Sequence, residues 1–161
     1  MNIEEFNKTV DLFADALYRF ILKNIKNKEK VEDIVQDSFE QLWKNAHKIE
    51  LSKAKSYLFT TAYHKTIDLI RKEKREIKMD EEHEKKHIFT TNNPDIQEIL
   101  NKAIDLLPSV QKAVLLLRDY EGYSYKEIEE ITGLSESQVK VYIYRARSFL
   151  KEYIGNISVL I

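Results

Sequence analysis

The sequence contains no cysteine, and this absence excludes disulfides, zinc sites built from cysteine and cysteine nucleophiles. Only 3 glycines and 2 prolines occur among its 161 residues, so long uninterrupted helices are possible. No apolar run approaches the about 20 residues that a membrane span needs, and the acidic N-terminus does not resemble a secretory signal. We therefore expect a protein of the reducing cytoplasm that does not insert into a membrane.

The two signs of charge nearly cancel over the whole chain, which has 26 basic and 27 acidic residues. A net charge of −1 by itself argues against a nucleic-acid binder. The local balance differs, because residues 1–75 carry a net +3, residues 76–97 a net −3 and residues 98–161 a net −1. Residues 137–151 hold four cations and no acid, so the whole-chain sum hides basic patches.

Apolar residues recur at helical spacing through most of the chain, and no alternation of period two is long enough to predict a strand. In the first half we expect helices over residues 3–24 and 29–45. A third helix should begin near Ser52 and run into the basic cluster at 71–75.

Residues 76–97 break this pattern, because they are charge-dense, then polar, and contain Asn-Asn-Pro near their end. Such composition is typical of a linker. The sequence therefore predicts an all-α protein with two small helical domains, 1–75 and 98–161, joined by a flexible acidic linker.

Helix-start and helix-stop signals are sharper in the second half. Pro108 suits a first helical position, and the helix that follows should stop at Gly122. Ser124–Glu127 and Ser135–Gln138 both have the form of a capping box. With the turn at Gly133 between them, they predict a short helix, a turn and a longer helix, which is the helix-turn-helix pattern.

The last helix, which we expect to end near Gly155, has two different faces. One stripe on a helical wheel is apolar and should pack on the preceding helices: Val139, Ile143, Ala146 and Leu150. The opposite stripe carries cations and an aromatic hydroxyl: Lys140, Tyr144, Arg147 and Lys151. A recognition helix needs such groups to reach phosphates and base edges. A solvated basic face is the alternative, but the helix-turn-helix pattern favours DNA recognition.

The second expected helix carries a polar stripe opposite its apolar one. Asp33, Asp37 and Gln41 follow one another at intervals of four residues, with Gln36 beside them. Solubility alone explains such a stripe, and the functional alternative is a docking face for a basic or polar helical partner.

The third expected helix combines aromatic side chains with cations. Tyr57, Tyr63 and His64 precede Lys65 and the basic cluster at 71–75. Aromatic rings stack on bases and cations follow the backbone, so this mixture suits unpaired DNA. The alternative is that the aromatic rings lie in the core, which we expect for some of them in any case.

The segment His83–His87 reads H-E-K-K-H and matches the H-E-x-x-H pattern of zinc proteases. Such a site needs two imidazoles one helical turn apart, a glutamate base and a third ligand. The pattern lies in the charge-dense linker, and no histidine follows it. We therefore expect no catalytic residue, no metal site, no cofactor and no enzymatic activity.

Two blocks of the sequence resemble the extracytoplasmic-function (ECF) group of bacterial RNA polymerase sigma factors. VEDIVQDSFEQLW (31–43) is similar to the family's polymerase-binding segment, and YLFTTAYHKTIDLIRKEKR (57–75) to its promoter-melting and −10-reading segment. Residues 107–147 resemble the −35-reading helix-turn-helix. The resemblance implies a sigma factor that binds core RNA polymerase and directs it to promoters, by −10 base capture and −35 major-groove recognition.

The resemblance also implies a role for individual residues. The residues that dock on the polymerase clamp would be Asp33, Gln36, Asp37 and Gln41. The −10 DNA contacts would be Tyr57, Tyr63, His64, Lys65, Arg71, Lys72, Lys74 and Arg75, beside a base-capture pocket at residues 47–52. The −35 contacts would be Ser137, Lys140, Tyr144, Arg145, Arg147 and Lys151. Further partners implied are the polymerase flap and an anti-sigma factor, with no small-molecule substrate.

Five positions depart from the family pattern. The family usually has Trp at Tyr57 and Asn at His64, often has Ser-Arg at 141–142 where this chain has Val-Tyr, and commonly has Ala at Glu129. These changes predict a promoter preference of its own rather than another class of protein. A helix-turn-helix repressor or activator with a dimerising first half is the alternative interpretation, and it would bind promoter DNA without polymerase.

Overall fold

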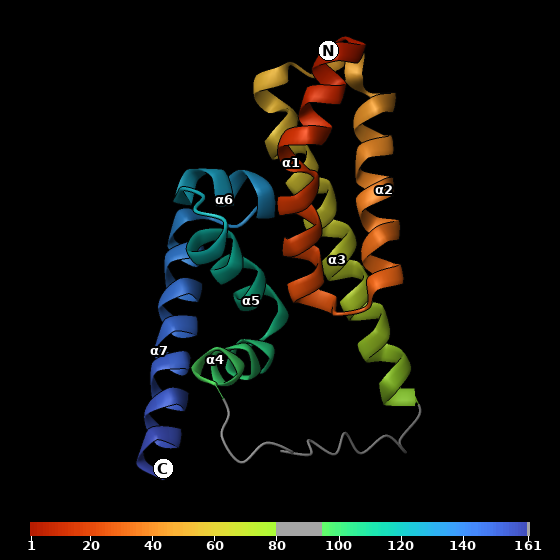
Figure 1. Cartoon of the computed structure of the whole chain (residues 1–161). Helices are drawn as coiled ribbons and strands as arrows, with labels where there is room; N and C mark the ends of the chain where they lie inside the picture. The colour runs from red at the N-terminus through yellow and green to blue at the C-terminus, as the bar shows by residue number, and fades with distance from the viewer. Residues whose placement is uncertain (80–94, 161) are drawn as a thin grey trace.

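Every element of the structure is helical. The computed structural model describes residues 1–79 and 95–160, and these ranges contain no strand. The first half consists of α1 (Ile3–Ile25), α2 (Lys28–Lys44), the short 3-10 turns η1 (Ala46–Lys48) and η2 (Leu51–Lys53), and α3 (Ala54–Met79). The second half consists of α4 (Ile96–Asp105), α5 (Ser109–Leu115), the π-helical turn η3 (Leu116–Tyr120), α6 (Tyr125–Thr132) and α7 (Glu136–Leu160) (Figure 1). The all-α prediction is confirmed for the described residues.

The helices α1, α2 and α3 form a three-helix bundle. α1 begins at a capping box in which Asn2 and Glu5 exchange hydrogen bonds of 2.8 and 3.2 Å. It ends at Lys26, whose backbone is left-handed. Each helix directs an apolar stripe inward, and the buried residues include Leu17, Phe20, Ile21, Val31, Leu42, Leu58, Phe59 and Ile67. Burying one such side chain contributes about 1.5–3 kcal/mol, so this packing holds the bundle together.

The predicted helix-turn-helix is confirmed in the second half. Ser124 accepts a 3.1 Å hydrogen bond from the backbone N–H of Glu127, and Ser135 accepts one of 3.2 Å from that of Gln138. Between these two caps α6 ends at Gly133, whose φ of 77° favours a residue without a Cβ atom. The stripe of α7 that was predicted to pack inward is buried at Val139, Ile143 and Ala146.

Three helix boundaries differ from the sequence-based expectation. α3 continues past the basic cluster to Met79, because no proline, glycine or capping residue stops it there. Pro108 is the N-cap of α5 rather than its first helical residue, since its ψ of 144° is extended. α7 does not end near Gly155 but continues to Leu160. An internal glycine costs about 1 kcal/mol relative to alanine, which is too little to end a long helix.

The two halves of the chain pack against each other along α3. α6 contacts α3, and α5 contacts both α1 and α3 (Figure 1). Phe59 of α3 meets Tyr123, which precedes α6, in an edge-to-face contact with ring centroids 5.0 Å apart. Both rings are buried, and the apolar residues of the two halves form one continuous cluster.

Among residues 1–79 and 95–160, three ion pairs cross this contact, and in each of them the cation comes from the first half. The pairs are Arg19–Glu121, Lys26–Asp105 and Lys55–Glu127. Arg19 donates two hydrogen bonds, of 3.0 and 2.7 Å, to Glu121. The Glu121 side chain is only 4% exposed, so this bidentate pair is shielded from water on the carboxylate side.

Candidate nucleic-acid interface

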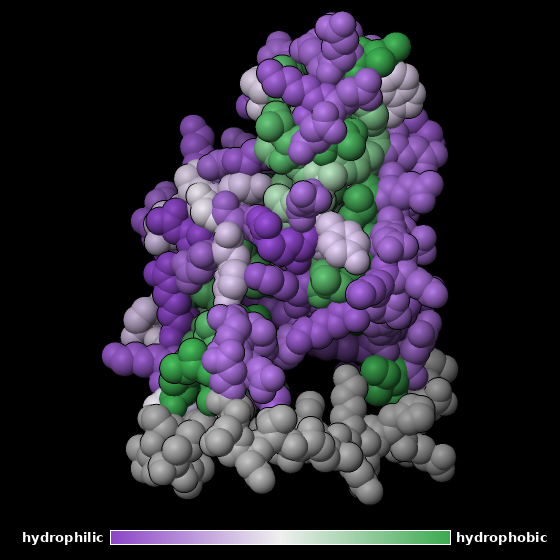
Figure 2. All heavy atoms as spheres, in the orientation of Figure 1, coloured by the Kyte–Doolittle hydropathy of each residue, from purple (hydrophilic) through white to green (hydrophobic). Residues whose placement is uncertain are grey.

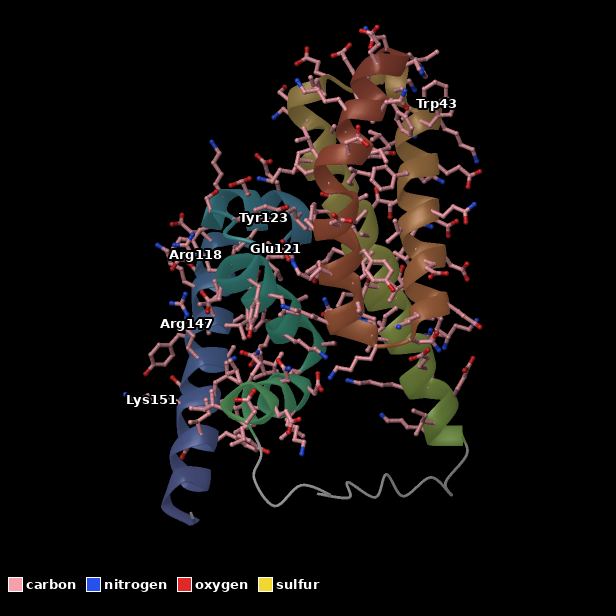
Figure 3. The ribbon with its side chains drawn as sticks, viewed as in Figure 1. Trp43, Arg118, Glu121, Tyr123, Arg147 and Lys151 are labelled. Atoms are coloured by element: carbon pink, nitrogen blue, oxygen red, sulfur yellow. The ribbon has the colours of Figure 1, made fainter. Side chains whose placement is uncertain are left out.

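The helix α7 presents a solvent-facing strip that holds the predicted −35 residues. Tyr144 is 73% exposed and Val141 is 43% exposed. The other exposed residues of the strip are Ser137, Lys140, Arg145, Arg147 and Lys151. Figure 3 shows Arg147 and Lys151 on the outer side of α7, away from the first half.

Two of the cations on this strip are already paired with carboxylates. Arg147 donates from Nε and Nη2 to Asp119 of η3 at 3.0 and 2.5 Å, and this bond raises the pKa of Arg147. Lys140 pairs with Glu136, one turn earlier, at 2.8 Å, and this contact raises the pKa of Lys140. Arg145 has no carboxylate partner within residues 1–79 and 95–160. Arg145 is therefore more available to a DNA strand than Arg147.

Two residues that the sequence analysis did not single out, Arg118 and Tyr125, adjoin the strip. The guanidinium carbon of Arg118 lies 4.5 Å from the centroid of the Tyr125 ring, and Lys140 Nζ lies 5.6 Å from it. A hollow of about 420 Å³ lies between Tyr125 and α7, and Tyr144 also lines it. This grouping joins η3, α6 and α7, so no local spacing in the sequence could reveal it.

A second hollow opens at the N-terminal end of α3, beside η1 and η2. Its volume is about 480 Å³, and it is lined by Lys48, Ile49, Glu50, Lys53, Ser56, Tyr57 and Thr60. The Tyr57 hydroxyl accepts a 3.0 Å hydrogen bond from the side-chain amide of Asn45, which anchors the ring at the wall. An aromatic ring, hydroxyls and lysines together suit an unpaired base and its phosphate.

The other predicted −10 residues are divided between the surface and the core. Five are exposed along α3: His64, Arg71, Lys72, Lys74 and Arg75. Lys65 is half-buried, and its Nζ lies 3.9 Å from a carboxylate oxygen of Asp37. Tyr63 is only 5% exposed, and burial raises its pKa. Tyr63 therefore cannot contact DNA in this conformation.

The helix α2 turns its predicted docking stripe toward solvent. Asp33, Gln36 and Asp37 are exposed, and Gln41 is partly exposed. None of them is drawn into the core, because the inward positions are taken by Val31, Ile34, Ser38 and Leu42. The stripe is therefore accessible to a partner over about two turns of the helix.

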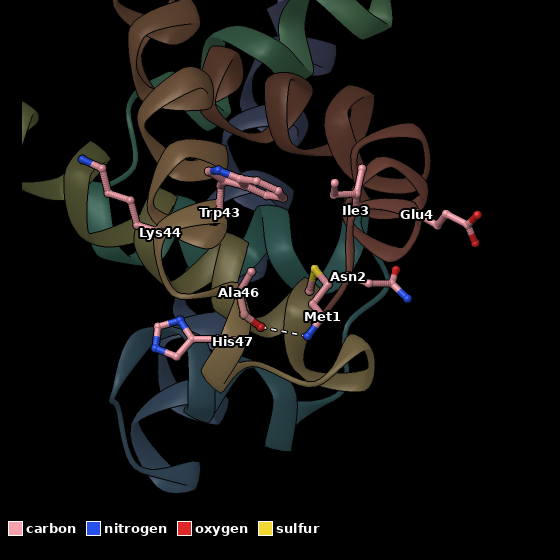
Figure 4. Close-up of a pocket in the computed structure, with 8 residues that line it drawn as sticks. All are labelled: Met1, Asn2, Ile3, Glu4, Trp43, Lys44, Ala46 and His47. Atoms are coloured by element: carbon pink, nitrogen blue, oxygen red, sulfur yellow. Dashed lines mark hydrogen bonds between the residues drawn. The ribbon is translucent and has the colours of Figure 1, made fainter.

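An apolar surface lies beside this stripe, at the end of the bundle. Trp43 is 48% exposed and lies 5.0 Å, centroid to centroid, from the ring of Phe6. Trp43 also lines a shallow hollow of about 920 Å³ together with Met1, Ile3 and His47 (Figure 4). Figure 2 shows that apolar atoms gather between α1 and α2 on a face that is otherwise mostly hydrophilic.

No helix among the described residues is long and apolar enough to cross a membrane. In the same part of the chain, no cluster of three or more His, Cys, Asp or Glu side chains could hold a metal ion. The segment His83–His87, with its zinc-protease pattern, lies outside the described residues.

Two family profiles match the chain, one in each half. Sigma-70 region 2 matches residues 9–76, and Sigma-70, region 4 matches residues 97–150. The two matches together cover about three quarters of the chain, in the order that the sequence resemblance implied.

Individual relatives match over most of their length. The ECF RNA polymerase sigma factor SigM of Bacillus subtilis (strain 168) is 29% identical over 156 residues, which are 94% of each chain. SigX of the same organism, also an ECF sigma factor, is 26% identical over 170 residues, which cover 93% of this chain and 84% of SigX.

A solved structure has the same fold. The sigma factor RpoE from Bartonella quintana, crystallised in complex with the anti-sigma factor NepR, superposes with a TM-score of 0.78 at 24% identity. The superposition covers 95% of this chain and 98% of that one. The chain thus belongs to the sigma-70 family as an ECF sigma factor, a non-enzymatic subunit that directs RNA polymerase to promoters for transcription initiation.

Proposed function

We propose that this sigma factor docks on core RNA polymerase through α2 and reads the promoter with two separate surfaces. Residues 1–75 form the polymerase-docking and −10-reading domain, residues 98–161 form the −35-reading domain, and residues 76–97 join them. The observation that carries this proposal is the pairing of an open hollow of about 480 Å³ beside Tyr57 on one half with a cationic helix face on α7 of the other. We place this activity in the cytoplasm, where polymerase works.

On the first half, the hollow beside Tyr57 captures an unpaired base of the −10 element. Stacking of a base on an aromatic side chain contributes about 1–3 kcal/mol. The residues that contact the phosphates and neighbouring bases are His64, Lys65, Arg71, Lys72, Lys74 and Arg75. Tyr63 is buried and contributes to the packing of α3 rather than to a DNA contact.

On the second half, α7 enters the major groove of the −35 element. Tyr144 and Arg145 are exposed on this helix, as are Ser137, Lys140, Arg147 and Lys151. Arg147 uses two of its five N–H groups for Asp119, so the remaining three are available to a phosphate or a base edge. Arg145 has no carboxylate partner in the described part of the chain, and we assign it a contact with a base edge.

The stripe Asp33, Gln36, Asp37 and Gln41 docks on the polymerase clamp, and the second half contacts the flap. An anti-sigma factor was crystallised with the sigma factor of Bartonella quintana, and the two proteins share a fold. We infer that an anti-sigma partner also exists for this chain. It would prevent docking on polymerase by covering the same surfaces.

Run-off transcription tests the proposed function. We expect the chain, mixed with core polymerase, to give discrete transcripts from promoters selected out of a random library. In a footprinting assay without polymerase, the chain alone should not protect the same promoters from nuclease digestion. Failure to bind core polymerase and to direct transcripts would overturn the proposal, and protection without polymerase would instead support a repressor or activator.

Replacing Tyr57 tests base capture. Tyr57→Ala should slow open-complex formation by the holoenzyme about 5- to 150-fold, because the stacking energy of about 1–3 kcal/mol is lost. Tyr57→Trp should keep most of the wild-type rate, since an indole also stacks. The rate can be followed with a fluorescent base analogue in the −10 element.

Tyr57→Phe is the matched control for this experiment, because it keeps the ring and removes only the hydrogen bond with Asn45. We expect its rate to fall by no more than about 2- to 13-fold, since one such bond contributes about 0.5–1.5 kcal/mol. An unchanged rate of open-complex formation in Tyr57→Ala would show that Tyr57 is not part of the capture site.

A further inference from the structure

Asp119 of η3 binds the guanidinium group of Arg147 through two hydrogen bonds. Arg147 Nε donates to Oδ2 of Asp119 at 3.0 Å, and Nη2 donates to Oδ1 at 2.5 Å. A bidentate bond of this kind fixes the plane of the guanidinium group as well as its position. The Asp119 side chain is 33% exposed and that of Arg147 is 50% exposed, so the pair lies at the surface of the second half.

This pair occupies one edge of the guanidinium group and leaves another edge free. A guanidinium group carries five N–H donors in a rigid plane. Asp119 accepts from Nε and from one N–H of Nη2, so the other N–H of Nη2 and both of Nη1 remain. Nη1 and Nη2 together form a second fork, which matches two oxygens of a phosphate. Arg147 can therefore bind Asp119 and a phosphate at the same time.

Arg147 lines the hollow of about 420 Å³ that lies between Tyr125 and α7. The other polar side chains of this hollow carry hydroxyl groups or cations: Tyr125, Lys140, Tyr144, Ser148 and Lys151. Within residues 1–79 and 95–160, no carboxylate lines it. A base edge presents donors as well as acceptors, whereas a phosphate presents acceptors and a negative charge. The composition of the hollow therefore favours a phosphate as the partner of Arg147.

The π-helical turn η3 gives Asp119 a fixed attachment to the domain. Leu116 and Leu117, at the start of the turn, are buried in the core. The backbone N–H of Glu121 donates a 3.0 Å hydrogen bond to the carbonyl of Leu116, five residues earlier. The wider turn changes the direction of the side chains that follow, relative to a regular α-helix, and such turns are frequent at functional sites. Asp119 thus reaches α7 from a rigid element.

We propose that Asp119 is a positioning residue for the −35 contact, because it holds the guanidinium group of Arg147 in the orientation that binds a DNA phosphate. An arginine that is not held loses its rotamer freedom when it binds DNA, and this loss weakens the complex. Arg147 is ordered by Asp119 before DNA arrives, so the loss does not fall on the DNA complex. This inference rests on the proposed function, because it needs α7 to enter the −35 major groove.

The sign of the change in DNA affinity separates this role from the simple repulsion between an acid and DNA. If Asp119 only repelled a nearby phosphate, removing its charge would strengthen DNA binding by less than about twofold at about 0.1 M salt. If Asp119 positions Arg147, removing its charge weakens DNA binding by about 2- to 13-fold, which corresponds to the rotamer freedom of one long side chain.

Asp119→Asn tests the inference in the holoenzyme, because it keeps the shape of the side chain and removes its charge. The affinity for a promoter fragment with a −35 element can be measured by fluorescence anisotropy between about 50 and 200 mM salt. We expect the affinity to fall by about 2- to 13-fold. The plot of log affinity against log salt should become shallower by up to about 0.9, the contribution of one phosphate contact. A role in packing alone would lower the melting temperature and leave this slope unchanged.

Glu136→Gln is the matched control, because it removes the carboxylate that pairs with Lys140 at 2.8 Å. Lys140 is a point charge on a flexible stem, so its carboxylate does not orient a fork, and we expect equal or tighter DNA binding. Asp119→Ser, which also removes the carboxylate, replaces Asp119→Asn if the amide variant does not fold.

The wild-type holoenzyme is measured first on promoter fragments with and without the −35 element. Equal affinity for the two fragments would count against the proposed function rather than against the role of Asp119. Once that dependence is established, equal or tighter DNA binding by Asp119→Asn, or an unchanged salt slope, would overturn the inference.

Discussion

Asp37→Arg should weaken the binding of this sigma factor to core RNA polymerase by about 100-fold or more, because reversing a charge within a docked face costs several kcal/mol. Asp37 lies in the middle of the exposed stripe of α2, and its side chain is 52% exposed. Its ion pair with Lys65, at 3.9 Å, is open to solvent. Losing such a pair costs at most about 1 kcal/mol, so the fold should survive.

The affinity can be measured by fluorescence anisotropy with labelled core polymerase, and the fold by circular dichroism. Asp11→Arg is the matched control, since it makes the same charge change at an exposed position of α1 outside the stripe. We expect the control to bind within about threefold of the wild type. Wild-type affinity in the Asp37→Arg variant would show that α2 is not the docking helix.

Arg145→Ala should lower transcription from promoters that depend on the −35 element by about 5- to 150-fold, which corresponds to the about 1–3 kcal/mol of a good contact between arginine and a base. The loss should concentrate at one or two base pairs, because a phosphate contact would weaken all sequences alike. Run-off assays on a set of single-base substitutions in the −35 element would measure it. An equal loss of transcription from all promoters of that set would show that Arg145 contacts the DNA backbone and not a base.

Two comparisons sharpen this experiment. Lys126→Ala removes an exposed cation from α6, outside the strip, and should leave transcription unchanged. Arg147→Ala removes a cation that is bonded to Asp119, so it should lower thermal stability as well as transcription. A variant at Arg147 therefore cannot separate DNA contact from packing, whereas a variant at Arg145 can.

The helix-turn-helix could be predicted from the sequence because its signals are local. A serine cap, a glycine turn and a second serine cap lie within fifteen residues, and each acts on its neighbours in the chain. The inward stripe of α7 is equally local, since helical periodicity alone sets it. The same reasoning misplaced the end of α7, because a glycine weakens a helix without being obliged to end it.

The contacts that reshape the candidate site are not local and could not be predicted in this way. Arg147 meets Asp119 across 28 positions, and Arg19 meets Glu121 across 102. Nothing in the spacing of charges distinguishes these pairs from the many others that the chain could form. The burial of Tyr63 depends on tertiary packing in the same manner, because a tyrosine suits both a core and a stacking surface.

The three ion pairs that join the halves in the described part of the chain have the same polarity, with cations on the first half and carboxylates on the second. Their strength therefore depends on ionic strength. Exposed pairs such as Lys55–Glu127 weaken as the Debye length shrinks from about 10 Å at 0.1 M salt to about 3 Å at 1 M. The shielded Arg19–Glu121 pair and the Phe59–Tyr123 contact respond less. The salt concentration of a buffer therefore changes the strength of the contact between the two halves of the free subunit.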